Sequence, residues 1–458
     1  MRTVLVITAM VLAFVPAGTA RAGEPTRPNF HILLTDDQRW DCLGCMGHPL
    51  LKTPNLDRLA AEGVLFNNSF VTTSICCISR ASLMTGRYAR NHRVGDFSTP
   101  LPAEVLAESL PALLRKAGYR TGCYGKWGIG GPPPKDVFDE WDAWGGQGAF
   151  FHNVDGVKVH NSEYLTRRAE AFLRSGQPGQ PFCLAVLYKS PHEPYQPDPR
   201  DAGLFVDAIV PVPKTYTAKH FEAMPAFIRT SEGRTRALRD HPTPERYQEF
   251  VKNYLRCIAG VDRSVGRLVK LLDELKLTEN TVIVFSSDNG FFLGEHGLSH
   301  KWLMHEESIR VPLIIRDPRL PAALRGQRLD PLVLNIDVAP TLLEYAGVAV
   351  PKGMDGRSLK PLLTGQPVAW RTDFFYEHHY HHGGRIPRTE GVRTTEWKYI
   401  TYYDVEPAFE ELYDLRRDPH EEHNLAADPA HRERLEALRA LYKQHLARFG
   451  PPVLPAKK

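Results

Sequence analysis

Short apolar runs alternate with amphipathic segments along most of the chain. Two such runs, NFHILLT at 29–35 and PFCLAVLY at 181–188, are typical of strands buried on both faces of a sheet. A third, TVIVFSS at 281–287, has the same character. Between Thr243 and Leu275, apolar residues recur at three- and four-residue steps and predict a long helix. Strands alternating with helices predict an α/β domain around a mostly parallel sheet.

Three shorter helices are predicted between these elements. The first has Pro54 at its first position and ends at Gly63. The other two span about 103–117 and 338–346. The segment 190–242 is predicted to be rich in loops, because proline and charged residues are frequent there.

The pattern of predicted elements changes near residue 366. KYITYYD and FEELYDL are typical of the strands of a hairpin, and 429–449 is predicted to be a terminal helix. These features predict a smaller C-terminal α+β subdomain over 366–458, with a small antiparallel sheet. The larger α/β domain would then span 23–365.

The first residues are typical of an export signal. Arg2 precedes an apolar run at 4–15, and Ala20 and Ala22 form a small-x-small cleavage site. The pattern predicts a signal peptide at 1–22, with an uncleaved anchor as the alternative. Because no later run reaches about 18 apolar residues, we expect no integral membrane segment after signal removal. The mature protein would be secreted or periplasmic.

The net charge and the number of cysteines argue against some classes of function. The net charge of +4 over 458 residues is nearly balanced, and without a basic stripe we expect no nucleic-acid partner. Seven cysteines are an odd number, so at least one stands outside any intramolecular disulfide. The pair Cys42 and Cys45 lacks further ligands at zinc spacing. It fits a local disulfide or two small buried residues better.

Acidic side chains follow two of the predicted buried strands. Asp36 and Asp37 come after the first, and Asp288 and Asn289 follow the third. Ligands gather at the carboxyl ends of strands in open α/β sheets, and hard oxygen donors suit Ca²⁺ or Mg²⁺. The alternative is that these residues only punctuate turns. Two clusters after two buried strands favour the metal site.

The segment SICCISRASLMTG, 74–86, combines two cysteines with an arginine. A helix beginning near Ser79 would direct its positive end at the preceding residues and favour an anion there. Arg80 adds a fork of donors that suits a tetrahedral oxyanion. A thiol in this place is expected to have a lowered pKa and could act as a nucleophile. The alternative is two small residues packed at a helix start.

This segment resembles the signature of the type I sulfatases, in which a cysteine is followed by serine and arginine at fixed spacing. Ser79 and Arg80 set the register and identify Cys76, because Cys77 has an alanine four residues later. The resemblance implies an alkaline-phosphatase-like fold and oxidation of Cys76 to Cα-formylglycine. It also implies a formylglycine-generating enzyme as a partner during maturation.

Other segments extend the resemblance over most of the mature chain. LLTDDQRWD and VIVFSSDNGFFLGEHGLSHKW are similar to the family's two metal segments, and GYRTGCYGKWG and YKSPHEP to two further site segments. The resemblance implies sulfate contacts for Lys126 and Lys301, and a leaving-group proton from His192 or Lys301. It implies a divalent metal, Ca²⁺ or possible Mg²⁺, held by Asp36, Asp37, Cys76, Asp288 and Asn289.

Two positions depart from the family pattern. Ile78 stands where proline or alanine is usual, inside the segment read by the maturation enzyme. Gly128 replaces a histidine that usually takes the proton in the step that expels sulfate. His296 and His305, in the second metal segment, are candidate bases in its place.

The sequence therefore predicts a sulfatase that hydrolyses sulfate esters through a formylglycine hydrate and a divalent metal. The expected substrate is a sulfated polysaccharide or oligosaccharide, because the His- and Arg-rich segment 377–393 would suit a rim that reads an anionic sugar. That segment could instead be a metal tract or a solvated loop. The alternatives for function are a phosphomonoester or phosphonate hydrolase of the same superfamily and an unconverted, non-catalytic binder of sulfated glycans.

Overall fold

The computed structural model describes residues 27–452, so the predicted signal peptide at 1–22 lies outside the described residues. A central eight-stranded sheet has the order β13-β2-β12-β9-β1-β8-β4-β5. Its strands are β1 (Asn29–Asp36), β2 (Val64–Phe66), β4 (Arg120–Lys126), β5 (Glu140–Trp144), β8 (Phe182–Pro191), β9 (Thr281–Ser287), β12 (Leu313–Arg316) and β13 (Gln327–Leu329). Strand β1 pairs in parallel with β8 and β9, and β4 does so with β5 and β8, whereas β12 runs antiparallel to both neighbours. The mostly parallel sheet predicted from the sequence is confirmed.

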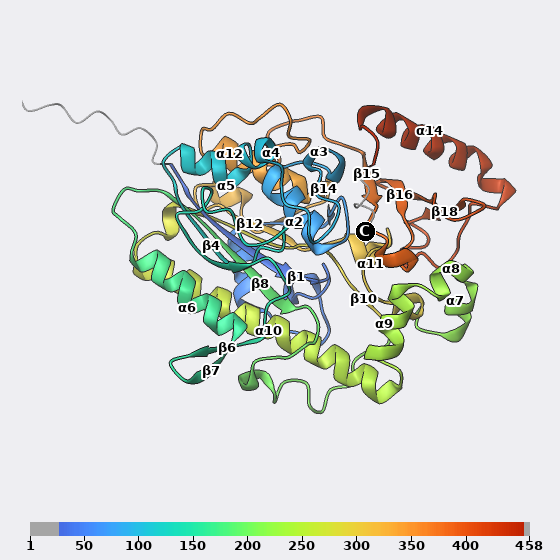
Figure 1. Cartoon of the computed structure of the whole chain (residues 1–458), viewed down its shortest axis with the longest axis horizontal. Coiled ribbons are helices and arrows are strands. Elements are labelled where there is room, and N and C mark those ends of the chain that lie inside the picture. The colour runs from blue at the N-terminus through green and yellow to red at the C-terminus, as the bar shows by residue number, and fades with distance from the viewer. Residues whose placement is uncertain (1–26, 453–458) are drawn as a thin grey trace, which may run out of the picture.

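Helices cover both faces of this sheet (Figure 1). One face packs against α1 (Pro54–Glu62), α6 (Asn161–Arg174) and α10 (Pro244–Glu274), and the other against α2 (Cys76–Thr85), α5 (Leu110–Lys116) and α12 (Val338–Tyr345). Every residue of β1, β8 and β9 is buried between these layers. This burial on two faces explains why the three strands are continuous apolar runs rather than alternating ones.

One predicted helix is wrong, and the prediction for one loop-rich segment is incomplete. The helix expected over 103–117 is two helices, α4 (Ala103–Ala107) and α5, with Ser109 in extended backbone between them. Pro111 lies at the second position of α5, where its missing N–H would have left an acceptor of a continuous helix unpaired. The segment 190–242 also contains helices, namely α7 (Ala218–Ala223), α8 (Ala226–Arg229) and α9 (Glu232–Asp240). All three are too short to show a long apolar face in the sequence. The charged helix α9 forms ion pairs such as that of Arg236 with Glu193, and α8 packs Ile228 into an apolar cluster.

A second, antiparallel sheet lies beside the α/β layers, at the right of Figure 1. Its order is β15-β16-β17-β18, and helix α14 packs on it. The bounds are β15 (Asp373–His378), β16 (Thr389–Thr394), β17 (Trp397–Tyr402), β18 (Phe409–Asp414) and α14 (Arg432–Arg448). One apolar cluster joins Phe374 and Tyr399 of this sheet to Phe70 and Met304 of the main layers. The subdomain boundary near 366 stays a prediction.

Short elements complete the fold. They are α3 (Ala89–His92), α11 (Glu306–Ile309), α13 (Lys360–Leu363), and the strand pairs β6 (Phe151–Val154) with β7 (Val157–His160), β10 (Phe292–Leu293) with β11 (Ser299–His300), and β3 (Ser69–Phe70) with β14 (Val333–Leu334). All seven cysteines lie in the described part of the chain and none forms a disulfide. Cys42 is buried and Cys45 is half-buried, so the expectation of two small buried residues is met by Cys42 and only in part by Cys45. Among residues 27–452, no helix is long and apolar enough to cross a membrane.

Candidate active site

The site lies where four neighbouring strands of the sheet end. Strand β1 ends at Asp36, β4 at Lys126 and β8 just before His192, and Asp288 follows β9. Because these strands are parallel neighbours, their carboxyl ends meet at one edge of the sheet. The helix that carries Cys76 opens at the same edge.

Helix α2 begins at Cys76, three residues before the start near Ser79 that the sequence predicts. Ile75 caps it in extended backbone, and the first N–H to bond within the helix is that of Ser79, which donates to the Ile75 carbonyl at 2.9 Å. The N–H groups of the first turn, from Cys76 to Ile78, are therefore left without helical acceptors. The positive end of the helix lies at Cys76 itself.

Both thiols of this segment are buried. Cys76 is 1% exposed, and burial raises its pKa although Lys126 and Lys301 act in the opposite sense. The lowered pKa that the sequence predicted is wrong for the chain without bound ions, because the helix end and the cations do not outweigh the loss of water. Cys77 packs into an apolar cluster with Ile78 and Trp302. The two thiols thus face different surroundings, and Cys76 is the one that faces the charged groups.

Three cations surround Cys76 and each is paired with a carboxylate. Lys301 Nζ lies 3.5 Å from Cys76 Sγ and forms an ion pair with Asp37. Lys126 Nζ pairs with Asp36 and also donates to Gln147 Oε1 at 2.7 Å. Arg80 Nε donates to Asp288 Oδ2 at 2.8 Å. All are fully enclosed, so the pairs are held in a medium of low dielectric.

The carboxylates retain oxygens that the protein does not use. Within residues 27–452, Asp36 Oδ1, Asp37 Oδ2 and Asn289 Oδ1 are buried without a hydrogen-bond partner. One ligand atom each of Asp36, Asp37, Cys76 and His192 can lie within 4.8 Å of the others. Unpartnered hard oxygens at one point fit Ca²⁺ or Mg²⁺. Of the predicted donor set, Asp36, Asp37 and Cys76 lie together, and His192, which was not predicted as a ligand, joins them. Asp288 lies outside this group, and both of its oxygens accept hydrogen bonds within the protein.

The pKa values of these carboxyl groups depend on which charged groups lie next to them. Burial alone would raise the pKa of Asp36, but the neighbouring cations Lys126 and Arg80 hold it well below its usual range. Asp288 is different, since burial and the neighbouring Asp36 raise its pKa to about 7. Its Oδ1 accepts from the backbone N–H of Asp37 at 3.1 Å and its Oδ2 from Arg80. Asp288 thus also fixes the position of two other site residues.

His192 lies against the acidic cluster. Its Nδ1 is 3.0 Å from the carbonyl of Glu193 and donates to it, which leaves Nε2 at 3.7 Å from Asp37 Oδ2. Burial lowers the pKa of His192 well below its ordinary value. The ring is therefore neutral, with an unprotonated nitrogen directed at the cluster.

Tyr376 ties the site to the C-terminal sheet, and the sequence contains no signal for it. Its hydroxyl accepts from the backbone N–H of Ser74 at 3.2 Å and donates to the carbonyl of Trp302 at 2.8 Å. These residues flank Cys76 and Lys301. His300 and Trp302 have φ of 72° and 86°, a left-handed backbone that costs about 1–3 kcal/mol for such residues. The hydroxyl of Tyr376 holds the strained loop against the nucleophile segment.

The two candidate bases lie elsewhere. His296 and His305 pack on one another with ring centroids 5.3 Å apart, and His305 lies 5.9 Å from Tyr413 of β18. Burial lowers the pKa of His296 to about 4. Both rings serve the packing of this loop on the C-terminal sheet, and neither gains support as the missing base.

The segment 377–393 lies next to the nucleophile helix. His378 and His379 are buried in it, whereas Tyr380 packs edge-on to Phe97 at 5.8 Å. Tyr380 also borders the apolar cluster that contains Cys77. In the described part of the chain, this segment adds no group of three or more metal-ligating side chains. The position of segment 377–393 beside α2 favours its role as a rim of the site over the alternative of a metal-binding tract.

Gly128 borders Lys126 and Arg80. Its φ is 73°, and a Cβ placed there would lie 3.4 Å from Arg80 Cδ and 3.7 Å from Lys126 Cε. A side chain at this position would therefore enter the site without displacing backbone, at the cost of a left-handed conformation.

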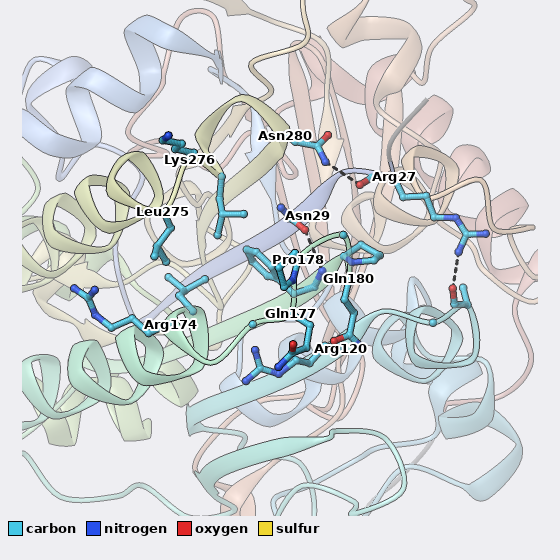
Figure 2. A pocket seen from close by; sticks show the side chains of 18 residues that line it. Arg27, Asn29, Arg120, Arg174, Gln177, Pro178, Gln180, Leu275, Lys276 and Asn280 are labelled. Atoms are coloured by element: carbon cyan, nitrogen blue, oxygen red, sulfur yellow. Dashed lines mark hydrogen bonds between the residues drawn. The ribbon is translucent and has the colours of Figure 1, made fainter. Parts of the chain in front are cut away.

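A cavity of about 840 Å³ lies at the opposite, amino edge of the sheet (Figure 2). The ends of α5, α6 and α10 border it, and its arginines satisfy their carbonyls: Arg27 Nη1 donates to Ala117 O at 2.5 Å and Arg120 Nη1 to Phe172 O at 2.8 Å. Basic groups at helix carboxyl ends offset the negative ends of the dipoles. The arginines Arg27 and Arg120 that line this cavity are therefore explained by their bonds to helix carbonyls.

A family model described as sulfatase matches residues 28–348. The chain belongs to the sulfatase family. A second model, described as the C-terminal part of N-sulphoglucosamine sulphohydrolase, matches residues 294–447. The resemblance seen in the sequence is confirmed, and the enzyme is a sulfuric ester hydrolase of alkaline-phosphatase-like fold.

Two relatives and one solved structure are similar to this sulfatase over most of its length. It is 29% identical to an N-acetylglucosamine-6-O-sulfatase of Bacteroides thetaiotaomicron, over 96% of this chain and 90% of that protein. It is 29% identical to the multifunctional alkaline phosphatase superfamily protein PehA of Trinickia caryophylli, over 89% and 92%. A solved structure of an enzyme in complex with its substrate D-glucosamine-2-N,6-O-disulfate superposes with a TM-score of 0.81, at 28% identity, over 92% of this chain and 98% of that one.

The contrast between the two thiols gives a first prediction. Cys76→Ala is expected to lower sulfatase turnover by about 1,000-fold or more, with the melting temperature unchanged, because the thiol faces the site. Cys77→Ala is the matched control. It should keep most activity and lose about 1 kcal/mol of unfolding free energy, because only apolar packing is removed. An inactive Cys77 variant beside an active Cys76 variant would show that the register is wrong.

Gly128 gives a second prediction. Without a histidine there, release of sulfate should be slower than release of the alcohol, so stopped-flow traces should show a burst of alcohol. Gly128→His should change the slow phase, because the imidazole would lie beside Arg80 and Lys126. Gly128→Ala carries the same backbone strain and is the control. The absence of a burst, together with equal rates in the two variants, would remove position 128 from the chemistry.

Proposed function

We propose that this sulfatase removes sulfate from a sulfated polysaccharide or oligosaccharide that contains glucosamine. The observation that carries the proposal is the ring of three paired cations around Cys76, beside carboxylate oxygens without partners. The names of the B. thetaiotaomicron relative and of the substrate complex support the glucosamine sugar. The signal-like sequence at 1–22 supports action in the periplasm or outside the cell.

The proposed roles follow the contacts. Cys76 is the precursor of formylglycine, made by a formylglycine-generating enzyme, and the aldehyde hydrate supplies the nucleophile. The divalent metal, Ca²⁺ or Mg²⁺, would be held by Asp36, Asp37, Asp288 and Asn289 with residue 76, and would polarise the sulfate. Lys126 and Arg80, which pair with Asp36 and Asp288 beside residue 76, would stabilise the charge on the oxygens of the sulfate.

The proton for the departing alcohol would come from Lys301 or from His192. Lys301 is closer to residue 76 by its 3.5 Å contact. A neutral His192 would need a water or the arriving substrate to supply its proton, because its Nδ1–H is engaged with Glu193. Lys301 is thus the better placed of the two donors.

The superfamily also contains enzymes that act on phosphorus. The PehA relative is named as a multifunctional member, so hydrolysis of phosphomonoesters or phosphonates is the second candidate. An unconverted protein that binds sulfated glycans without turnover is the third. A mass spectrum of the peptide that contains Cys76 separates the third candidate from the enzymes.

Paired substrates test the choice of sulfate over phosphate. We expect kcat/KM for 4-nitrophenyl sulfate to exceed that for 4-nitrophenyl phosphate by about tenfold or more. The reason is that the three cations at the site are balanced by three carboxylates, so the side chains contribute little net positive charge to balance a dianion. Faster hydrolysis of the phosphate by the same preparation would support the second candidate instead.

Removal of a carboxylate tests the metal. Asp36→Ala and Asp37→Ala should each lose bound Ca²⁺ or Mg²⁺ by elemental analysis and lose activity with it, because water does not replace a charged ligand. Asp139→Ala removes a carboxylate that pairs with Arg115 at a half-exposed place and is the control. Stoichiometric zinc in active protein, or full activity after exhaustive chelation, would contradict the assignment.

A further inference from the structure

Lys189 is a buried cation beside the site that no proposed step uses. It lies on β8, three residues before His192, and is 3% exposed. Its Nζ donates to the backbone carbonyl of Gln147 at 3.1 Å and lies 5.0 Å from the centre of the Phe150 ring. One of its three donors therefore has a partner in the protein, and that partner is uncharged.

The lysine has no counter-ion. Among residues 27–452, no carboxylate oxygen lies within 4.0 Å of Lys189 Nζ, whereas Lys126 and Lys301 each have an ion pair. Burial lowers the pKa of Lys189, and the more distant Asp36 and Asp37 only partly oppose this. A buried charge without a partner is costly. Such a cost is explained when the missing partner is a ligand.

The position of Lys189 relative to the sulfate-binding lysine follows from one residue. Gln147 accepts from Lys126 through its side-chain Oε1 at 2.7 Å and from Lys189 through its main-chain carbonyl. Gln147 thus links the ammonium groups of Lys126 and Lys189 by one hydrogen bond to each. This linkage limits the distance between the two groups to about 11 Å. Gln147 itself is exposed, so both lysines lie one hydrogen bond from a residue that reaches solvent.

Lys189 does not contact the carboxylates that pair with the cations around the nucleophile. Its own contacts are with Gln147 and Phe150, in the segment that follows β5. Lys126 and Lys301 instead pair with Asp36 and Asp37. An anion bound to it would be a different group from the sulfate held at Cys76.

We propose that Lys189 binds a second anionic group of the sugar, a sulfate or a carboxylate, while the first sulfate is cleaved. The inference rests on the proposed function and adds that the substrate carries two negative groups within one or two sugar residues. Lys189 then determines specificity: it selects doubly charged sugars over sugars with a single sulfate.

The test compares three substrates: D-glucosamine-2-N,6-O-disulfate, D-glucosamine 6-sulfate and 4-nitrophenyl sulfate. Wild type should have a kcat/KM for the disulfate about tenfold or more above that for the monosulfate. Lys189→Met keeps the apolar stem and should lower that ratio about tenfold, mainly through KM, whereas Lys189→Arg should restore part of it. The change in the ratio, rather than in any single rate, is the measured effect.

Arg239→Met is the matched control. Arg239 is a cation of the same side of the site, but its side chain is 49% exposed and already paired with Glu193 and Asp240. Its loss should leave the ratio of the two sugars unchanged. Lys189→Met should also melt no lower than wild type, because it removes an unpaired buried charge.

Several results would overturn the proposal. An unchanged ratio in Lys189→Met, an equal loss on all three substrates, or a wild type without preference for the disulfate would each do so. A wild type that releases no sulfate from any of them would refute the proposed function instead. Calorimetry of disulfate binding then still decides for Lys189, since equal Kd values for wild type and Lys189→Met would exclude it.

Discussion

The active site depends on the balance of buried charge at the carboxyl edge of the sheet. Parallel pairing of β1, β4, β8 and β9 forces the residues at their ends into one small volume. Three carboxylates meet there out of contact with water, which would cost several kcal/mol for each without a partner. Each has a cation within reach, in the pairs Asp36 with Lys126, Asp37 with Lys301, and Asp288 with Arg80. The same pairs set the positions of the groups that surround Cys76.

This balance has a consequence for the order of binding. The lysines and the arginine are occupied by carboxylates, yet an oxygen of Asp36 and one of Asp37 stay without partners. A divalent cation would take those oxygens and weaken the hold of the carboxylates on the lysines. The cations would then be available to an anion. Charge pairing thus balances the buried carboxylates in the absence of a metal, and a bound metal would make the cations available to a sulfate. Lys189, which has no carboxylate to release, needs no such preparation.

The sequence predicts what depends on local pattern and misses what depends on packing. Strands β1, β8 and β9 are recognisable because burial on two faces requires a continuous run of apolar residues. Helix α10 is recognisable because burial along one side requires apolar residues at three- and four-residue steps. The start of α2 is missed because its cap, Ile75, is an apolar residue and not one of the polar caps that mark a helix start. The direction of the Cys76 pKa is missed because the burial of a thiol is not visible in its neighbours along the chain. Gln147 and Tyr376 belong to no motif of the site, and only the fold brings them to it. Lys189 lies inside the YKSPHEP segment, but its lack of a counter-ion is visible only in the fold.

The C-terminal sheet takes part in the site through the loop that carries Lys301. The left-handed residues on either side of that lysine cost about 1–3 kcal/mol each, and such strain persists only where surrounding contacts impose it. Tyr376 supplies one of these contacts, and the packing of His305 on Tyr413 supplies another. The family match for the C-terminal part begins at residue 294, before Lys301, and runs on through the second sheet. Loop and sheet therefore form one structural unit, although the lysine acts in the α/β domain. The position of the ammonium group at Cys76 is set by a subdomain whose own residues, in the described chain, contribute no ligand to the acidic cluster.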